Sequence, residues 1–407
     1  MDDLLRRAHL AAPHELPLLF ERHAATLGLG DPMVYLADLQ QAVLVPFVVP
    51  SGPLDSDDSQ CLGIDSTLAG RAFQRVEPVL EQAGPPDGEV RVWAPLVNGT
   101  ERLGVLVVTV PARVTVEAPG SVLMTRIKRF ASLAAELVMT KSLSGDTIVR
   151  LRRRAEMGLA AEMQWSLLPP LTFASMSVTV AGGLEPAYEV GGDSIDYAVD
   201  AGVTKFAIFD GMGHGLSSAH LATLIVAAYR NGRRSNRSLT ALVRIIDEAV
   251  VSTYGGEMFA TAVIAELDTE SGLLSWVNVG HPEPLLLRDG RLIKLLHVDP
   301  TLPVGLDLNP EESGPEITVG TESLQRGDLV VIYTDGVVEA RSPEGDFFGQ
   351  DRLVDLLTRH LAADLPAPES MRRIIHALMK HHQGQLADDA TMLFVQWCPE
   401  GTEALVP

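Results

Sequence analysis

The sequence predicts an α+β protein built from more than one domain. The chain has 407 residues, which exceeds the size of one typical hydrophobic core. Short apolar, strand-like runs alternate with amphipathic helical segments, and a helical stretch near the middle separates two β-rich parts. We therefore expect a mixed α/β domain over residues 1–120, a helical linker over 121–170 and a second domain over 171–398.

Charge and cysteine content narrow the functional classes. The chain carries 32 Lys and Arg against 53 Asp and Glu, a formal net charge of −21, so we expect neither a nucleic acid nor a membrane as partner. Cys61 and Cys398 are the two cysteines, and their separation excludes a disulfide framework or a thiolate zinc cluster. Neither cysteine has the basic setting of a nucleophile. The N-terminus has no signal-peptide pattern, which favours a cytoplasmic protein.

The first segment mixes strand and helix patterns. Glycine supplies the positive φ of a tight turn, so Asn98-Gly99 between two apolar runs predicts a hairpin. The Pro119-Gly120 pair punctuates the chain and marks the first boundary. The elements expected here are a strand at 42–49, a helix capped by Ser66 and running through Phe73, and hairpin strands at 90–97 and 103–110.

The middle segment reads as one long helix or a pair of helices. One stripe has the spacing of a narrow helical seam, which implies a partner helix and a homodimer through the linker: Leu123, Ile127, Phe130, Leu133 and Leu137. After Gly145 a second stripe follows, of Ile148, Leu151, Leu159, Met163 and Leu167. Proline stops it at Pro169-Pro170. The basic cluster of Arg150 and Arg152 to Arg154 is either a solvated helix face or part of a dimerising linker that transmits a signal.

The third segment alternates apolar strands with a few helices. Many strands that read as antiparallel, with amphipathic helices between them, predict helices on the outer faces of sheets. The strands expected are 177–182, 195–199, 205–209, 260–267, 273–279, 284–288, 329–333 and 392–396, and the helices are 218–231 and 238–254.

Four carboxylate sites lie at the ends of these strands. They are Asp193 in VGGD, Asp210 in DGMGHG, Asp335 in YTDG and Asp388 in ADDAT. Each one alone is typical of a turn, because Asp beside Gly is a common turn pair. Together they form a candidate ligand set, since a rigid sheet holds each carboxylate and glycines leave room for an ion. Oxygen ligands without clustered His or Cys favour Mg²⁺ or Mn²⁺ over zinc.

An ordered series of motifs resembles a known family. EVGGDSID, FAIFDGMGHG, MFATAVIAELD, NVGHPEPLLL, GDLVVIYTDGVVEA and DDATMLF are together similar to the PPM (protein phosphatase 2C-like) phosphatases of the bacterial SpoIIE/RsbU-type branch, over residues 160–398. The resemblance implies a β-sandwich flanked by helices, with a site for two metal ions. It implies that Asp193, Asp210, the carbonyl of Gly211, Asp335 and Asp388 hold the ions, with Asp210 bridging both. Asp389 is a weaker candidate, either a ligand or a residue that supports the ligands.

The resemblance also implies an activity. A water that bridges the two ions would attack phosphorus in line, so no side-chain nucleophile is needed. The implied substrate is phosphoserine or phosphothreonine on an anti-sigma-factor antagonist. A non-enzymatic scaffold, and a two-metal enzyme acting on nucleotides or nucleic acid, remain as alternatives. One departure from the family is Ser194-Ile195-Asp196, where an aromatic residue usually follows GGD.

The histidines near these motifs have two possible roles, one catalytic and one structural. His214 and His281 are candidates for general acids, because histidine titrates near neutrality. Their glycine-rich, turn-like settings favour a structural role in ordering loops instead. His381 and His382 read as surface residues of a helix.

The first domain resembles a GAF sensor module. DSTLAGRAF followed by VWAPLVNGTERLGVLVV is similar to the helix and final hairpin of that family, over residues 15–115. The resemblance implies a regulatory domain that binds a small ligand, responds to a redox signal or binds nothing. It also implies that linker helices position the metal site, with Gly145 and Gly158 as candidate pivots.

Overall fold

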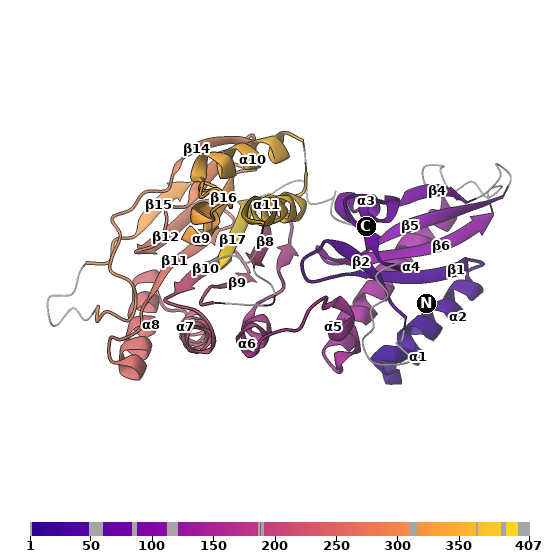
Figure 1. The fold of residues 1–407 in the computed structure, drawn as a ribbon, viewed down its shortest axis with the longest axis horizontal. Coiled ribbons are helices and arrows are strands. Elements are labelled where there is room, and N and C mark those ends of the chain that lie inside the picture. Colours follow the sequence, from indigo (N-terminus) through magenta and orange to yellow (C-terminus); the bar gives the residue numbers. More distant parts are fainter. Residues whose placement is uncertain are drawn as a thin grey trace. The chain divides into compact units, whose positions relative to one another are not determined.

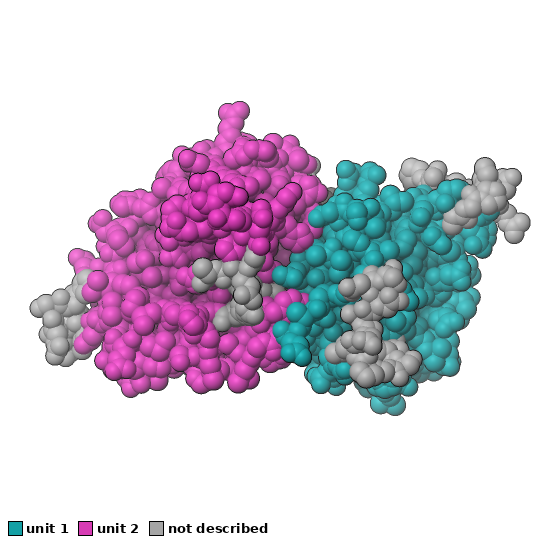
Figure 2. All heavy atoms as spheres, viewed as in Figure 1, with its two compact units in different colours: residues 1–156, 403–407 teal, residues 157–402 magenta. Residues whose placement is uncertain are grey.

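The chain forms two compact units (Figures 1 and 2). The computed structural model describes residues 2–48, 60–83, 88–111, 121–185, 188, 191–308, 316–363, 365–383 and 388–397. Unit 1 ends at Glu156 and unit 2 begins at Met157. The predicted boundary pair at 118–120 and the residue Cys398 lie outside the described residues.

Unit 1 is a six-stranded antiparallel sheet with helices on both faces. The strand order is β3-β2-β1-β6-β5-β4. Its elements are α1 (Asp2–Leu10), η1 (Pro13–Glu15), α2 (Leu16–Thr26), β1 (Gly30–Ala37), β2 (Val43–Pro46), β3 (Leu62–Gly63), α3 (Leu68–Arg75), β4 (Val79–Ala83), β5 (Glu89–Asn98), β6 (Glu101–Pro111), α4 (Val122–Ser142) and α5 (Asp146–Arg152).

Alternation along the strands gives the sheet of unit 1 two different faces. One face carries Val92, Leu106 and their neighbours, which pack with Phe20 of α2 and Phe130 of α4 in one cluster. The other face is covered by the eight residues of α3, which bury Phe73 against a smaller cluster. The second face is therefore much less covered than the first.

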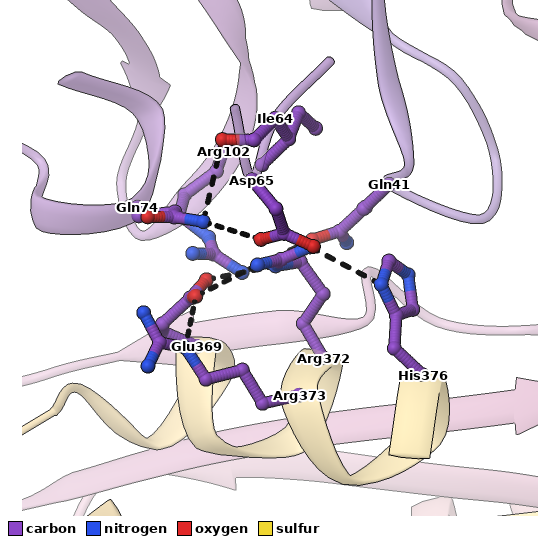
Figure 3. A network of polar contacts seen from close by, with 9 residues as sticks. All are labelled: Gln41, Ile64, Asp65, Gln74, Arg102, Glu369, Arg372, Arg373 and His376. Carbon is purple, nitrogen blue, oxygen red and sulfur yellow. Dashed lines mark hydrogen bonds and ion pairs between the residues drawn. The ribbon is translucent and has the colours of Figure 1, made fainter. Parts of the chain in front are cut away.

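The predicted hairpin of unit 1 is confirmed. β5 and β6 pair around Gly99, whose φ is +59°. The predicted helix at 66–73 is present as α3, but its cap is one residue further on: Thr67 Oγ1 accepts a hydrogen bond from the Gly70 amide at 3.0 Å. Gln74 of α3 donates to a carboxylate oxygen of Asp65 at 2.6 Å (Figure 3).

The stripe of α4 faces its own unit. Ile127, Phe130, Leu133 and Leu137 are buried in the cluster that includes α2 and the sheet. The predicted partner helix is present within the same unit, since the seam packs on α2 as well as on the sheet, and an amphipathic helix buries its apolar face equally well on either. The stripe consequently gives no support to a homodimer through the linker.

Unit 2 contains two antiparallel sheets, of orders β15-β12-β11-β10-β9 and β14-β13-β16-β17-β8-β7. Its elements are α6 (Leu159–Leu167), β7 (Thr172–Ala174), β8 (Val178–Glu185), β9 (Ser194–Asp200), β10 (Val203–Gly211), α7 (Leu216–Arg234), α8 (Leu239–Tyr254), β11 (Ala260–Asp268), β12 (Leu273–Val279), β13 (Leu285–Arg288), β14 (Arg291–Leu295), β15 (Gly320–Ser323), β16 (Leu329–Tyr333), α9 (Asp335–Glu339), α10 (Gln350–Ala362), α11 (Ala367–His382) and β17 (Ala390–Trp397).

The two sheets of unit 2 share one core. Phe206 and Ile208 of β10 join Val330 and Ile332 of β16 in a single cluster, so these inner faces meet. On the outer face of the first sheet, Phe209 packs with α7 and α8. The outer face of the second sheet packs with α10 and α11. On α11, Glu369 accepts hydrogen bonds from Arg372 and Arg373 (Figure 3).

The predicted strands of unit 2 are confirmed, each to within a few residues of its expected ends. The prediction that one apolar stripe runs from Ile148 to Leu167 was wrong. α5 and α6 are separate short helices, and Leu159 is 66% exposed while Ala161 and Gln164 are buried. Within the described residues, none of the helices combines the length and apolar character needed to cross a bilayer.

Candidate metal centre

The strand order brings the four acid sites to one edge of unit 2. Asp193 immediately precedes β9, and Asp210 lies near the end of its antiparallel neighbour β10. Asp335 follows β16 by two residues, and Asp388 precedes the antiparallel neighbour β17 by two. Because the end of one antiparallel strand lies beside the start of the next, each pair of acids meets at one end of its sheet.

Hydrogen bonds connect the two pairs. Both carboxylate oxygens of Asp389 accept from the Gly191 amide at 2.8 Å, and one of them accepts from the Asp193 amide at 3.2 Å. Thr334 Oγ1 donates to Asp193 Oδ2 at 2.8 Å and accepts from the Thr391 amide at 3.0 Å. The loop that carries Asp193 leads into β9 of the first sheet. It is held by Thr334 and Asp389, which adjoin β16 and β17 of the second sheet.

Two glycines allow this close approach. A Cβ on Gly192 would lie 2.1 Å from the carbonyl oxygen of Gly211, and a Cβ on Gly336 would lie 2.0 Å from that of Asp389. Both distances are far below contact distance, so neither position accepts a side chain without a backbone shift. The glycines of the GGD and TDG motifs are needed for packing at this edge.

The carboxylates repel one another. Burial raises the pKa of Asp210 to about 7, and the charges of Asp335, Asp388 and Asp389 add to the effect. Burial also raises the pKa of Asp193, with the charges of Asp389 and Asp210 as further causes. The pKa of Asp335 is raised by burial and by Asp388. These shifts mean that the acids are close enough to act on each other in a poorly solvated place.

Asp388 and Asp389 differ in their surroundings. Asp389 is 4% exposed, and its pKa is raised to about 6 by burial, with the amides of Gly191 and Asp193 acting against that rise. Asp388 is exposed, and one of its carboxylate oxygens accepts from the Asp389 amide at 2.9 Å. The oxygens of Asp389 are occupied by the backbone, which fits a supporting role behind Asp388.

The donor set suits a hard divalent cation, because carboxylate and carbonyl oxygens are the ligands that Mg²⁺ and Mn²⁺ prefer. Positive charge would also relieve the mutual repulsion of these acids. Across the described part of the chain, however, no three Asp, Glu, His or Cys side chains form a group already arranged to hold a metal ion. The ligand set of Asp193, Asp210, Gly211, Asp335 and Asp388 therefore stays a prediction, with its members neighbouring but not preassembled.

The histidines show different environments. The ring of His281 is buried, and its Nδ1 lies 2.7 Å from Thr261 Oγ1. Its backbone amide and carbonyl both bond the side chain of Asn278 at 2.8 Å. Burial lowers the pKa of His281 to about 3. This geometry favours the reading in which His281 orders its loop. His214 is exposed and lies opposite Gly191 in an isolated bridge.

Gln164, Ser218 and Thr334 contact the segments that carry the acids, and the sequence analysis did not name them. Gln164 of α6 is fully buried and its side-chain amide donates to the carbonyl of Asp193. Ser218 Oγ lies 2.9 Å from the Met212 carbonyl and 3.4 Å from that of Gly211. Thr334 stands directly before Asp335, so the TDG motif was a usable signal for it. Gln164 carried only a weak signal, as an amide within an apolar helix.

Asp196, the next acid after the GGD motif, has a structural role. Asp196 is 1% exposed and forms ion pairs with Arg230 at 3.0 Å and with Arg233 at 3.2 Å. Both arginines belong to α7. Asp196 therefore fixes β9 to α7 and is not one of the acids at the candidate centre.

Comparisons with known proteins find similarity over much of unit 2. Residues 200–398 match the family model described as stage II sporulation protein E (SpoIIE). Protein IcfG of Synechocystis sp. is 32% identical over 155 residues, covering 38% of this chain and 23% of that protein. Phosphoserine phosphatase RsbU of Bacillus subtilis is 22% identical over 245 residues, covering 60% of this chain and 70% of RsbU. The chain thus spans about a quarter of the first relative.

Among solved structures, the SiaA-PP2C domain of Pseudomonas aeruginosa is similar to this chain with a TM-score of 0.49 and 21% identity. The similarity covers 58% of this chain and 94% of that domain.

Proposed function

Because residues 200–398 are a domain of the SpoIIE family of PPM phosphatases, we propose that the chain is a Mg²⁺- or Mn²⁺-dependent protein serine/threonine phosphatase. The observation that carries the proposal is the meeting of Asp193, Asp210, Asp335 and Asp388 at one edge of unit 2, inside or beside the matched region. The raised pKa values of Asp193, Asp210 and Asp335 fit a place that a divalent cation neutralises.

The ligands proposed are the carboxylates of Asp193, Asp210, Asp335 and Asp388 and the carbonyl of Gly211. When bound, the two cations supply a water activated for in-line attack and neutralise the charge that develops on the phosphate oxygens. Other residues of the chain hold the proposed ligands in position. Thr334 holds Asp193 through its hydroxyl, and Asp389 holds the backbone on either side of Gly192. No side-chain nucleophile is required.

The substrate we propose is a phosphoserine or phosphothreonine of an anti-sigma-factor antagonist, acted on in the cytoplasm. The similarity to a protein named phosphoserine phosphatase supports the phosphoserine part of this proposal. We further propose that unit 1 is a GAF-like sensor that regulates unit 2. Its sheet with one lightly covered face supports a ligand-binding role for this unit.

Hydrolysis of a phosphoserine protein and of p-nitrophenyl phosphate, each with Mn²⁺ and with Mg²⁺, tests the proposed reaction. We expect activity that EDTA abolishes and that falls at least a hundredfold in Asp210→Ala. Asp299→Ala is the matched control, because Asp299 has an 89% exposed side chain and is not one of the proposed ligands. Activity insensitive to EDTA and to Asp210→Ala would refute the proposal. Inactivity with every metal would favour a binding scaffold instead.

A further inference from the structure

Unit 1 contains a cavity of about 880 Å³ on the lightly covered face of its sheet. Volumes of this order are typical of sites for small molecules. The cavity is lined by residues of β1, β4, β5 and β6, and by Leu68 and Ala69 at the start of α3. All of its lining residues belong to unit 1.

Strand register arranges the lining in two rows. In the first row, Glu81 pairs with Arg91, and Arg91 pairs with Thr109. Asp31 extends this polar row, because Thr109 Oγ1 donates to its carboxylate at 3.3 Å. In the second row, two strand positions further along, Trp93 pairs with Val107, and Val107 pairs with Met33. A polar edge therefore lies beside an apolar floor.

Two aromatic rings form part of the floor. The ring centroids of Tyr35 and Trp93 lie 6.0 Å apart, with the ring planes tilted by 53°. The Trp93 indole is only 8% exposed, and its Nε1 donates to Glu81 Oε2 at 2.8 Å. This bond fixes the orientation of the indole and places a carboxylate at its edge.

The charges around the cavity are mostly negative. Among the described residues, its lining holds the carboxylates of Asp31, Glu81 and Glu89 against the single guanidinium of Arg91. Arg91 is itself 3.9 Å from Glu81, so part of its charge is already compensated. An anionic ligand such as a nucleotide would meet net repulsion here, whereas a cation would meet both carboxylates and aromatic faces.

We propose that this cavity binds a small organic cation: a protonated amine or quaternary ammonium joined to an apolar body of about the size of one ring. The apolar body packs on Met33, Val107 and the two aromatic rings. The ammonium group lies at the polar row, where Glu81 and Asp31 attract it and the aromatic faces add a cation–π attraction. The inference concerns unit 1 alone and does not depend on the phosphatase activity.

The test uses three probes of similar size and different charge, measured by calorimetric titration into the full chain. Phenethylamine is a cation at pH 7, 2-phenylethanol is neutral and 3-phenylpropionate is an anion. We expect phenethylamine to bind at least tenfold more tightly than either of the others. Binding of phenylpropionate as tightly as phenethylamine, or no binding of phenethylamine at millimolar concentration, would overturn the proposal.

Two variants locate the site. Glu81→Gln keeps the shape of a partly exposed side chain while removing its charge, and we expect phenethylamine binding to weaken at least fivefold. Glu21→Gln removes an exposed charge from α2, outside the cavity, and should leave binding unchanged. Trp93→Phe retains an aromatic ring but loses the bond to Glu81, and should weaken binding less than Trp93→Leu. Equal affinity of Glu81→Gln and the unmodified chain would refute this location.

Discussion

Replacing Asp210 with Asn should stabilise the metal-free protein at alkaline pH. Burial, with the charges of Asp335, Asp388 and Asp389, raises the pKa of Asp210 to about 7, compared with an ordinary value of 3.8. Between pH 3.8 and pH 7, Asp210 is largely protonated in the folded chain and largely ionised in the unfolded chain. The free energy of unfolding therefore falls as the pH rises through this window. The Asn amide is neutral throughout and removes this dependence.

The size of the effect follows from the two pKa values. The difference between the pKa of Asp210 in the folded and in the unfolded chain corresponds to a loss of about 4 kcal/mol in the free energy of unfolding at pH 8. Asp210 retains partial exposure, and solvent screening reduces the figure, so we expect a gain of about 2–4 kcal/mol in Asp210→Asn. For a unit of this size, that gain raises the unfolding midpoint by about 4–16 °C.

Differential scanning calorimetry in EDTA measures this gain, with the transition of unit 2 followed separately from that of unit 1. At pH 5 the gain should shrink to less than half of its value at pH 8, because the folded chain is then largely protonated at Asp210. With Mn²⁺ at pH 8 the order should reverse, since the cation stabilises only the chain that retains its ligand. Asp299→Asn serves as control. An Asp210→Asn variant no more stable than wild type in EDTA at pH 8 would refute the electrostatic reasoning.

Two further predictions concern residues around the centre. Burial lowers the pKa of His281 to about 3, so its contribution to stability is lost as the pH falls from 6.5 towards 3. The stability difference between wild type and His281→Gln should therefore narrow by about 1.4 kcal/mol per pH unit below 6.5, and urea unfolding at pH 7 and pH 5 that gives a constant difference would contradict this. Gly192→Ala should cost about 1–3 kcal/mol in urea unfolding, because its Cβ would lie 2.1 Å from the Gly211 carbonyl oxygen. Gly158→Ala, whose Cβ would meet its nearest atom at 3.7 Å, is the control, and an equal cost in both variants would count against the close-approach argument.

The sequence was most informative where local chemistry and tertiary position coincide. Each acid of the candidate centre follows or precedes a strand-like run, and these runs are the strands β9, β10, β16 and β17. An apolar run of this kind has few alternatives to a buried strand, so its ends are predictable. The position of an acid at a strand end then required only that neighbouring strands be antiparallel.

The sequence was less informative where a pattern identified an apolar face but not the element that packs against it. The stripe of α4 gave the correct helix, but periodicity states which face is apolar and not what covers it. Periodicity alone does not distinguish a helix of another chain from the sheet of the same unit as the surface that covers this face. Gln164 shows the converse case, because a polar residue within an apolar helix is recognisable as a buried partner only after Asp193 has been placed beside it.

Asp388 and Asp389 show how tertiary contacts divide roles between identical residues. The two carboxylates adjoin in the chain, and hydrophobic periodicity does not separate them; only the resemblance of the DDAT motif to the family does. β17 begins directly after them, and successive residues of an extended chain point in opposite directions. One side chain is therefore exposed beside the other acids while its neighbour turns inward to the amides of Gly191 and Asp193. The inward carboxylate has its oxygens committed to the loop that carries Asp193, which leaves the outward one available to a cation.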